Sequence, residues 1–202
     1  MRVLALVLCA AVCSGEELPV LWNPPSGFPP TLRDIASRLP RDTDAKEACL
    51  ITYTHEGSHF LCRGKKGYHC VYVGEGKRWE IPTPPLVTEE VFAAFPGEMR
   101  GTTLYRIYLR QGQTEYWSAQ PLMILDEWRA YTVGSQTRQE LDMTTRAESV
   151  RHLESFTVYA KVLYDLAKEI EGYDISELRD FCRWNLEECR KIRDFRSEVV
   201  FD

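Results

Sequence analysis

Basic runs and histidine are both scarce in this chain of 202 residues. It holds four histidines, has a formal net charge of −5, and contains no run of lysine or arginine longer than Lys65-Lys66. Proteins that bind a phosphate backbone need a concentrated basic surface, which this sequence does not offer. We therefore expect no nucleic-acid partner.

Long apolar segments are absent beyond the first fifteen residues. Residues 3–13 form an unbroken apolar run between Arg2 and the small pair Ser14-Gly15. This order is typical of a secretory signal peptide, and the run is too short to span a bilayer. We expect residues 1–15 to be removed, and the mature chain to be secreted or held in the cell envelope without a membrane span.

Cysteine pairs with the spacing of a zinc site are missing as well. No Cys-x-x-Cys occurs among the seven cysteines, which argues against a zinc ion held by cysteine. Cys62 and Cys70 flank a glycine-containing turn and are candidates for a disulfide. Cys182 and Cys189 lie about 10 Å apart along a predicted helix, which is beyond disulfide reach. Together with Cys49 these make an odd number in the mature chain, so at least one thiol is left over.

What the sequence does contain is the composition of a globular protein, with 44% hydrophobic and 27% charged residues. Hydrophobic periodicity and turn residues predict an α+β fold with a small antiparallel sheet and two long C-terminal helices. Helices are expected at residues 31–39, 45–63, 88–95, 121–134, 144–171 and 175–196, and strands at 69–73, 77–81, 102–110 and 113–117, the last two forming a hairpin.

The helix expected at 45–63 has a rival interpretation. Asp44 and Glu47 have the spacing of a capping box, which favours a helix start. Residues 49–54, however, are rich in strand formers, and Gly57 weakens a helix by about 1 kcal/mol. A β-hairpin that turns at Gly57 is therefore the alternative, and it would hold residues four apart at a distance of about 13 Å.

A chemically specific string lies in this segment, His55-Glu56-Gly57-Ser58-His59, which matches H-E-x-x-H. On a helix the two histidines share one face about 6 Å apart, so both imidazoles are able to bind one metal ion. Zinc suits neutral imidazoles and, with three protein ligands, keeps a fourth position for water. Glu56 lies beside that pair, where a carboxylate can accept the proton of metal-bound water.

A catalytic zinc site needs a third protein ligand, and the sequence offers Glu127. It lies in an amphipathic helix beside large apolar residues, where an unpaired carboxylate would be costly. Glu89 and Glu90 are the alternatives, although acidic residues in a first helical turn also complement the helix dipole. Asp126 is a candidate partner for one histidine, and Tyr131, one turn beyond Glu127, is a candidate donor to a developing oxyanion.

With these residues the sequence resembles the zincin metallopeptidases of the gluzincin type, which carry H-E-x-x-H on one helix and a glutamate ligand on a later one. The resemblance rests on His55, Glu56, His59 and Glu127. It implies a zinc-dependent hydrolase of peptide bonds, whose peptide or protein substrate lies extended along a sheet edge such as the hairpin at 102–118. The alternative is a non-catalytic exported binding or envelope protein that retains a zincin-like fold.

The resemblance also suggests how the chain is organised, because it covers about residues 45–134. We expect a signal peptide at 1–15 and a proline-rich arm with a short helix at 16–43. A zincin-like metal-binding core follows at 44–143, and a C-terminal helical hairpin at 144–202 packs on that core.

Overall fold

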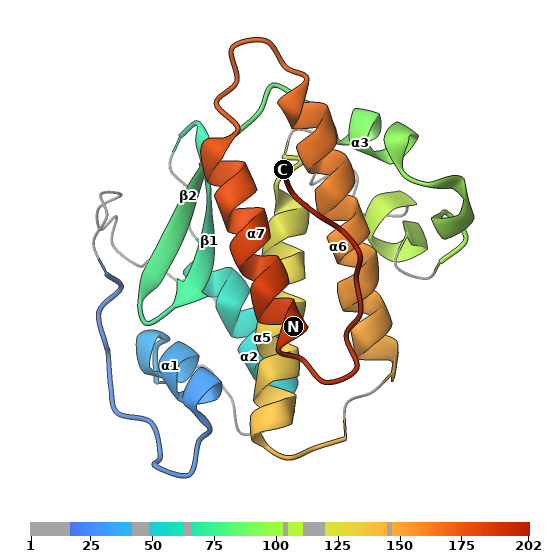
Figure 1. Ribbon diagram of the computed structural model, residues 1–202. Helices are drawn as coiled ribbons and strands as arrows, with labels where there is room; N and C mark the ends of the chain where they lie inside the picture. Colours follow the sequence, from blue (N-terminus) through green and yellow to red (C-terminus); the bar gives the residue numbers. More distant parts are fainter. Residues whose placement is uncertain (1–16, 42–48, 63–65, 103–104, 111–119, 145–146) are drawn as a thin grey trace.

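Figure 1 shows a computed structural model of the chain, which describes residues 17–41, 49–62, 66–102, 105–110, 120–144 and 147–202. Helices and one antiparallel strand pair make up the described part, which confirms the expected mixture of helix and small sheet. The elements are α1 (Pro30–Arg38), α2 (Leu50–Leu61), β1 (Tyr68–Gly74), β2 (Lys77–Pro82), α3 (Thr88–Ala94), the 3₁₀ turn η1 (Gly97–Met99), the π-helical turn η2 (Tyr105–Arg110), α5 (Met123–Glu140), α6 (Ala147–Lys168) and α7 (Ser176–Arg190).

The segment that carries the H-E-x-x-H string is helical, so the alternative β-hairpin is wrong. Helix α2 begins at Leu50, with Cys49 as its N-cap residue, and ends at Leu61. The start expected at residue 45, with its capping residues, falls within 42–48 and lies outside the described residues.

Gly57 has a packing role in α2 that offsets its poor helix propensity. A Cβ atom at this position would lie only 2.7 Å from Cγ2 of Ile35 and 3.0 Å from Cδ1 of Leu39. Only glycine therefore lets α1 approach α2 this closely. Tertiary packing thus determines that this segment is helical, although its local propensities favour both helix and strand.

Strands β1 and β2 form the antiparallel hairpin expected from the sequence, with Tyr68 opposite Pro82. Their tight turn uses backbone conformations with positive φ: 107° at Gly74, 52° at Glu75 and 78° at Gly76. Glycine adopts such angles without steric cost, which is why this turn could be predicted.

The prediction of a second hairpin at 102–110 and 113–117 is wrong for the residues that the structure describes. Tyr105–Arg110 forms the π-helical turn η2, and residues 111–119 lie outside the described residues. The edge strand that this hairpin would have offered to a substrate is therefore not present in residues 105–110.

Local contacts explain why η2 is helical. The Thr102 carbonyl accepts a hydrogen bond from the Arg106 N–H at 3.1 Å, and the Thr102 hydroxyl accepts one from the Tyr105 N–H at 3.2 Å. Tyr105 and Tyr108 both pack against the core, while Ile107 is 49% exposed. In so short a segment, alternating apolar residues fit a helical three-residue spacing as well as a strand.

Helix α5 lies at the centre of the molecule and packs on α2, α6, α7 and β1 (Figure 1). The stop expected at Gly134 is wrong, because the helix continues to Glu140. Gly134 instead lies against α2, where a Cβ atom would be 3.6 Å from the Ile51 carbonyl oxygen and 3.7 Å from Cβ of His55. Two glycines, one on α2 and one on α5, thus lie at helix–helix contacts.

Two apolar clusters fill the interior. The larger joins α3, α5, α6 and α7 with the sheet, and the smaller joins α1 and α2 with Tyr72 and Val133. The long C-terminal helices expected from the sequence are confirmed as α6 and α7. No helix within the described residues combines the length and the apolar composition needed to cross a membrane.

The candidate disulfide between Cys62 and Cys70 is wrong, because no disulfide joins them. The Cys62 thiol instead bonds the backbone, donating to the Ser58 carbonyl at 3.1 Å and accepting from the Tyr72 N–H at 3.1 Å. This contact fixes the end of α2 to β1.

Candidate metal centre

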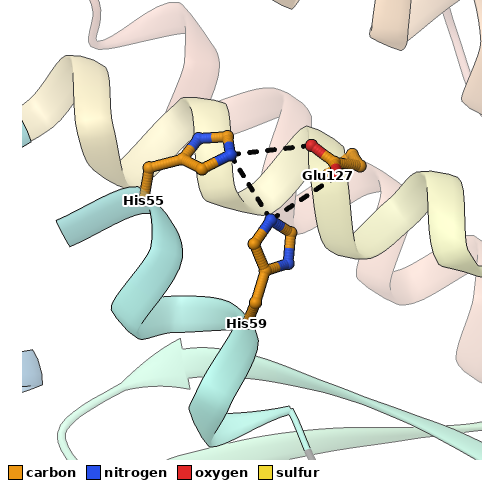
Figure 2. Close-up of side chains that lie close together, drawn as sticks. All are labelled: His55, His59 and Glu127. Atoms are coloured by element: carbon orange, nitrogen blue, oxygen red, sulfur yellow. Dashed lines mark hydrogen bonds and ion pairs between the residues drawn. The ribbon is translucent and has the colours of Figure 1, made fainter. Parts of the chain in front are cut away.

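Helices α2 and α5 bring together two histidines and one glutamate that lie far apart in the sequence. His55 and His59 are one turn apart on α2, and their Nε2 atoms are 3.4 Å from each other. Glu127 projects from α5 between them, with Oε2 3.6 Å from Nε2 of His55 and Oε1 3.6 Å from Nε2 of His59 (Figure 2). All three ligand atoms lie within 4.8 Å of one another, a group able to hold a metal ion.

The chemistry of this group fits a cation. The side chains of His55, His59 and Glu127 are only 16%, 21% and 12% exposed. Glu127 Oε2 is buried and has no hydrogen-bond partner, because its distance to His55 exceeds hydrogen-bond length. A buried carboxylate oxygen without a partner is costly, and a cation bound between these three side chains would remove that cost.

Asp126 supports His59 from the other side of its ring. Its Oδ2 lies 3.0 Å from Nδ1 of His59, and the carboxylate is 5% exposed. This contact fixes the ring orientation, so Nε2 faces Glu127. The structure thus places Asp126 where the sequence suggested a partner for one histidine.

The two histidines differ in their proton affinity. Burial lowers the pKa of His55, outweighing the opposing charge of Glu127. Burial also lowers the pKa of His59, but the hydrogen bond to Asp126 and the nearby negative charges of Asp126 and Glu127 outweigh it and raise this pKa to about 10. In the metal-free protein His59 therefore keeps a proton that a metal ion must displace.

Tyr131 lies one turn along α5 from Glu127, beside the first histidine. Its ring meets that of His55 edge-on, with centroids 4.7 Å apart. Its hydroxyl lies 2.9 Å from the hydroxyl of Tyr108, which comes from η2. Burial is the main cause that raises the pKa of both phenols, so both stay protonated and able to donate.

Tyr108 was not predicted as a site residue. The interpretation of residues 102–110 as a strand gave no reason to place it beside α5. A tyrosine pair at the centre depends on η2 folding back onto α5, which is a tertiary contact without a local signal. The structure therefore adds this residue to the site.

Glu56 lies at the water-facing side of the centre. It is exposed, and it lines a cavity of about 260 Å³ together with His55, Tyr108 and Tyr131. Its negative charge contributes to the pKa shifts of these three groups, which places it close to them. A carboxylate at such a cavity is able to exchange a proton with bound water.

The alternative ligands Glu89 and Glu90 are not brought to the histidines. Both lie in the first turn of α3, where Glu90 Oε2 accepts a hydrogen bond from the Val87 N–H at 3.0 Å. They are absent from the group of ligand atoms formed by the described residues. Their position agrees with the helix-capping role that the sequence also allowed.

Comparison with known proteins supplies no relative. No protein-family model matches the chain, and neither a curated protein nor a solved structure matches it significantly.

Proposed function

We propose that this protein is a zinc-dependent hydrolase of peptide bonds with a zincin-like core of the gluzincin type. The observation that carries the proposal is the convergence of His55, His59 and Glu127 around a buried carboxylate oxygen that lacks a partner. Two imidazoles and one carboxylate form a ligand set found in catalytic zinc sites, where the fourth position belongs to water.

Each neighbouring side chain has a role in this proposal. Zinc, when bound, lowers the pKa of a water ligand to about 7. Glu56 accepts the water proton and later passes it to the leaving amine. Tyr131 donates a hydrogen bond to the developing oxyanion, and Tyr108 holds the Tyr131 hydroxyl in place. Asp126 keeps the His59 ring oriented.

Export completes the proposal. The signal-peptide pattern of residues 1–15 would deliver the protein to the cell exterior or the envelope. We expect peptides or proteins as substrates, bound in the cavity beside Tyr108 and Tyr131.

The test combines metal analysis with hydrolysis of an unstructured protein such as denatured casein. The Glu56→Gln variant should keep its zinc and lose at least about 100-fold in turnover, because a general base of this kind contributes that much. The matched control is Glu89→Gln, an exposed glutamate on α3 outside the centre, which should keep both zinc and turnover. Undiminished turnover in Glu56→Gln would refute the assigned base.

A non-catalytic exported binding protein is the second candidate, and one contact favours it. Asp126 and Glu127 both face His59 within 3.0 and 3.6 Å, so an imidazolium between two carboxylates satisfies part of the centre without an ion. This function is compatible with the presence or the absence of bound zinc, and it predicts that Glu56→Gln changes none of the protein's properties.

A further inference from the structure

A second charged side chain lines the cavity of the metal centre. Arg138 lies on α5 eleven residues after Glu127, which places it about three turns further along the same helix face. It is 8% exposed and lines the cavity together with His55, Tyr131 and Ser135. His55 of the metal centre and Arg138 therefore border the same cavity.

Arg138 has no counter-ion within the described part of the chain. No described residue forms an ion pair with its guanidinium or accepts a hydrogen bond from it. None of its nitrogen atoms belongs to the buried atoms that lack a partner, so they remain in contact with the solvent of the cavity. A mostly buried cation that reaches water only through a cavity is ready to bind an anion there.

Two other largely buried arginines contrast with Arg138 in this respect. Arg38, on α1, donates to the Asp34 carboxylate at 3.0 Å. Arg129, on the opposite side of α5, donates to the backbone carbonyls of Tyr72 and Val73 and lies over the Trp184 ring. Both guanidinium groups thus have partners, although Nη1 of Arg129 is buried without one, whereas Arg138 has no partner among the described residues.

The surrounding charges favour an anion at the same end of the cavity. Ile51 and Thr52, in the first turn of α2, line it, and a helix N-terminus carries partial positive charge. Among the described residues, no side chain forms a capping hydrogen bond at this N-terminus. Of the described residues that line the cavity, Glu56 alone is acidic, and it forms no ion pair with Arg138.

We propose that Arg138 binds a carboxylate of the substrate, which makes the preferred substrates peptides with a carboxylate near the cleaved bond. This inference rests on the proposed peptidase function. The Cα atoms of Glu127 and Arg138 are separated by about 16 Å along the helix, and the arginine side chain leans back toward the helix N-terminus. The Glu127 side chain leans the same way, and an extended peptide covers about 3.5 Å per residue, so the carboxylate lies roughly four to five residues from the attacked carbonyl.

Either of two groups supplies this chemistry, the free C-terminus of a peptide or the side chain of an aspartate or glutamate. The experiment measures the binding of three matched peptides to the zinc-loaded Glu56→Gln variant by calorimetry. One peptide has a free C-terminal carboxylate, one a C-terminal amide, and one a C-terminal amide with an internal glutamate. Because this variant does not need to turn over, binding is read separately from activity.

We expect one of the two carboxylate peptides to bind about 10- to 100-fold more tightly than the plain amide, the range expected for hydrogen bonds to a charged group. Adding Arg138→Gln should abolish this preference, and Arg138→Lys should restore part of it. Arg151→Gln, which removes an exposed arginine of α6, is the matched control and should leave the preference unchanged. The carboxylate peptide that is preferred identifies the source of the anion.

Three results would overturn the inference: equal binding of all peptides, a preference that survives Arg138→Gln, or no peptide binding at all. A different result would reject the proposed hydrolase function and leave the carboxylate subsite intact. If the zinc-loaded chain with Glu56 intact cleaves none of the three peptides while the Arg138-dependent preference is present, the carboxylate subsite stands and the hydrolase does not.

Discussion

Two polar clusters of this molecule are partly buried, and they differ in how completely their groups are paired. Between α1 and β1, Asp34 accepts hydrogen bonds from Arg38 Nε at 3.0 Å, from the Tyr72 hydroxyl at 2.6 Å and from the Glu75 N–H at 2.9 Å. Between α2 and α5, Glu127 approaches its histidines only to 3.6 Å and keeps an oxygen without a partner.

The difference separates a structural cluster from a functional one. Every contact of Asp34 is made within the protein, so that cluster needs nothing from solution to be stable. The cluster at Glu127 contains a carboxylate oxygen without a hydrogen-bond partner, and its His55 lines a cavity, so the binding of a ligand there would recover free energy. The Asp34 cluster should therefore determine stability, and the Glu127 cluster should determine binding.

The pH dependence of zinc binding gives the largest expected effect. Because the pKa of His59 is raised to about 10, each bound ion displaces one proton. Zinc affinity should rise about tenfold per pH unit below that value, or roughly 100-fold between pH 6.5 and 8.5. Calorimetry in buffers of different ionisation enthalpy measures the released proton, and a flat affinity with no proton release would contradict the assignment.

In the metal-free protein, the raised pKa of His59 makes stability fall as the pH rises. Its pKa in the folded state lies above the ordinary value of 6.5, so its contribution to stability is complete below pH 6.5 and is lost as the pH rises toward 10. Zinc binding and metal-free stability should thus depend on pH in opposite directions, and denaturant titrations without zinc measure the second.

Substitution of Asp126 by asparagine tests whether this residue supports zinc binding by orienting His59. The change removes the charge that orients His59, so zinc affinity should fall about 10- to 100-fold while the three direct ligands remain. Competition with a zinc chelator of known affinity measures the loss. An affinity equal to that of the unmodified chain would show that Asp126 has no supporting role.

Substitution of Asp34 by alanine should affect stability alone. It removes three hydrogen bonds, including one from Tyr72, and we expect a loss of about 2 kcal/mol in the free energy of unfolding. Asp165→Ala, which breaks an exposed ion pair with Lys161 on α6, is the control and should cost about 0.5 kcal/mol or less. Zinc content should stay the same in both variants. A fall in zinc content for Asp34→Ala would contradict the claim that the Asp34 cluster affects stability and not metal binding.

The two interfacial glycines give expected effects on stability that differ in sign, and that of Gly134 is the smallest. Gly57→Ala places a Cβ atom 2.7 Å from Ile35 and should destabilise the protein by about 1–3 kcal/mol despite a better helix propensity. Gly134→Ala meets its nearest atoms at 3.6 Å and should be neutral or stabilise by up to about 1 kcal/mol. Thermal unfolding of both variants distinguishes them, and equal shifts would contradict the packing described here.

The sequence allowed those parts of the site to be predicted that follow from local periodicity. A four-residue spacing on a helix placed His55 and His59 together, and a carboxylate among apolar residues pointed to Glu127. The helix over Leu50–Leu61 was ambiguous by propensity, because Gly57 and its β-branched neighbours favour other structures. Its packing against α1 and α5 explains the result.

The remaining parts depend on tertiary contacts that leave no local trace. Gly134 resembled a helix stop, yet it is a contact point inside a longer helix. Tyr108 was assigned to a strand because a short alternation fits two periodicities. Arg138 gave no signal, since the expected end at residue 134 removed it from the helix that carries Glu127.

The zinc content of the purified chain tests the central claim most directly. The account predicts about one zinc ion per chain after reconstitution, as in a three-ligand site, and its loss in both His55→Ala and Glu127→Ala. Glu89→Ala should retain the ion. A chain that takes up no zinc, or a Glu127→Ala variant that keeps it, would contradict the account.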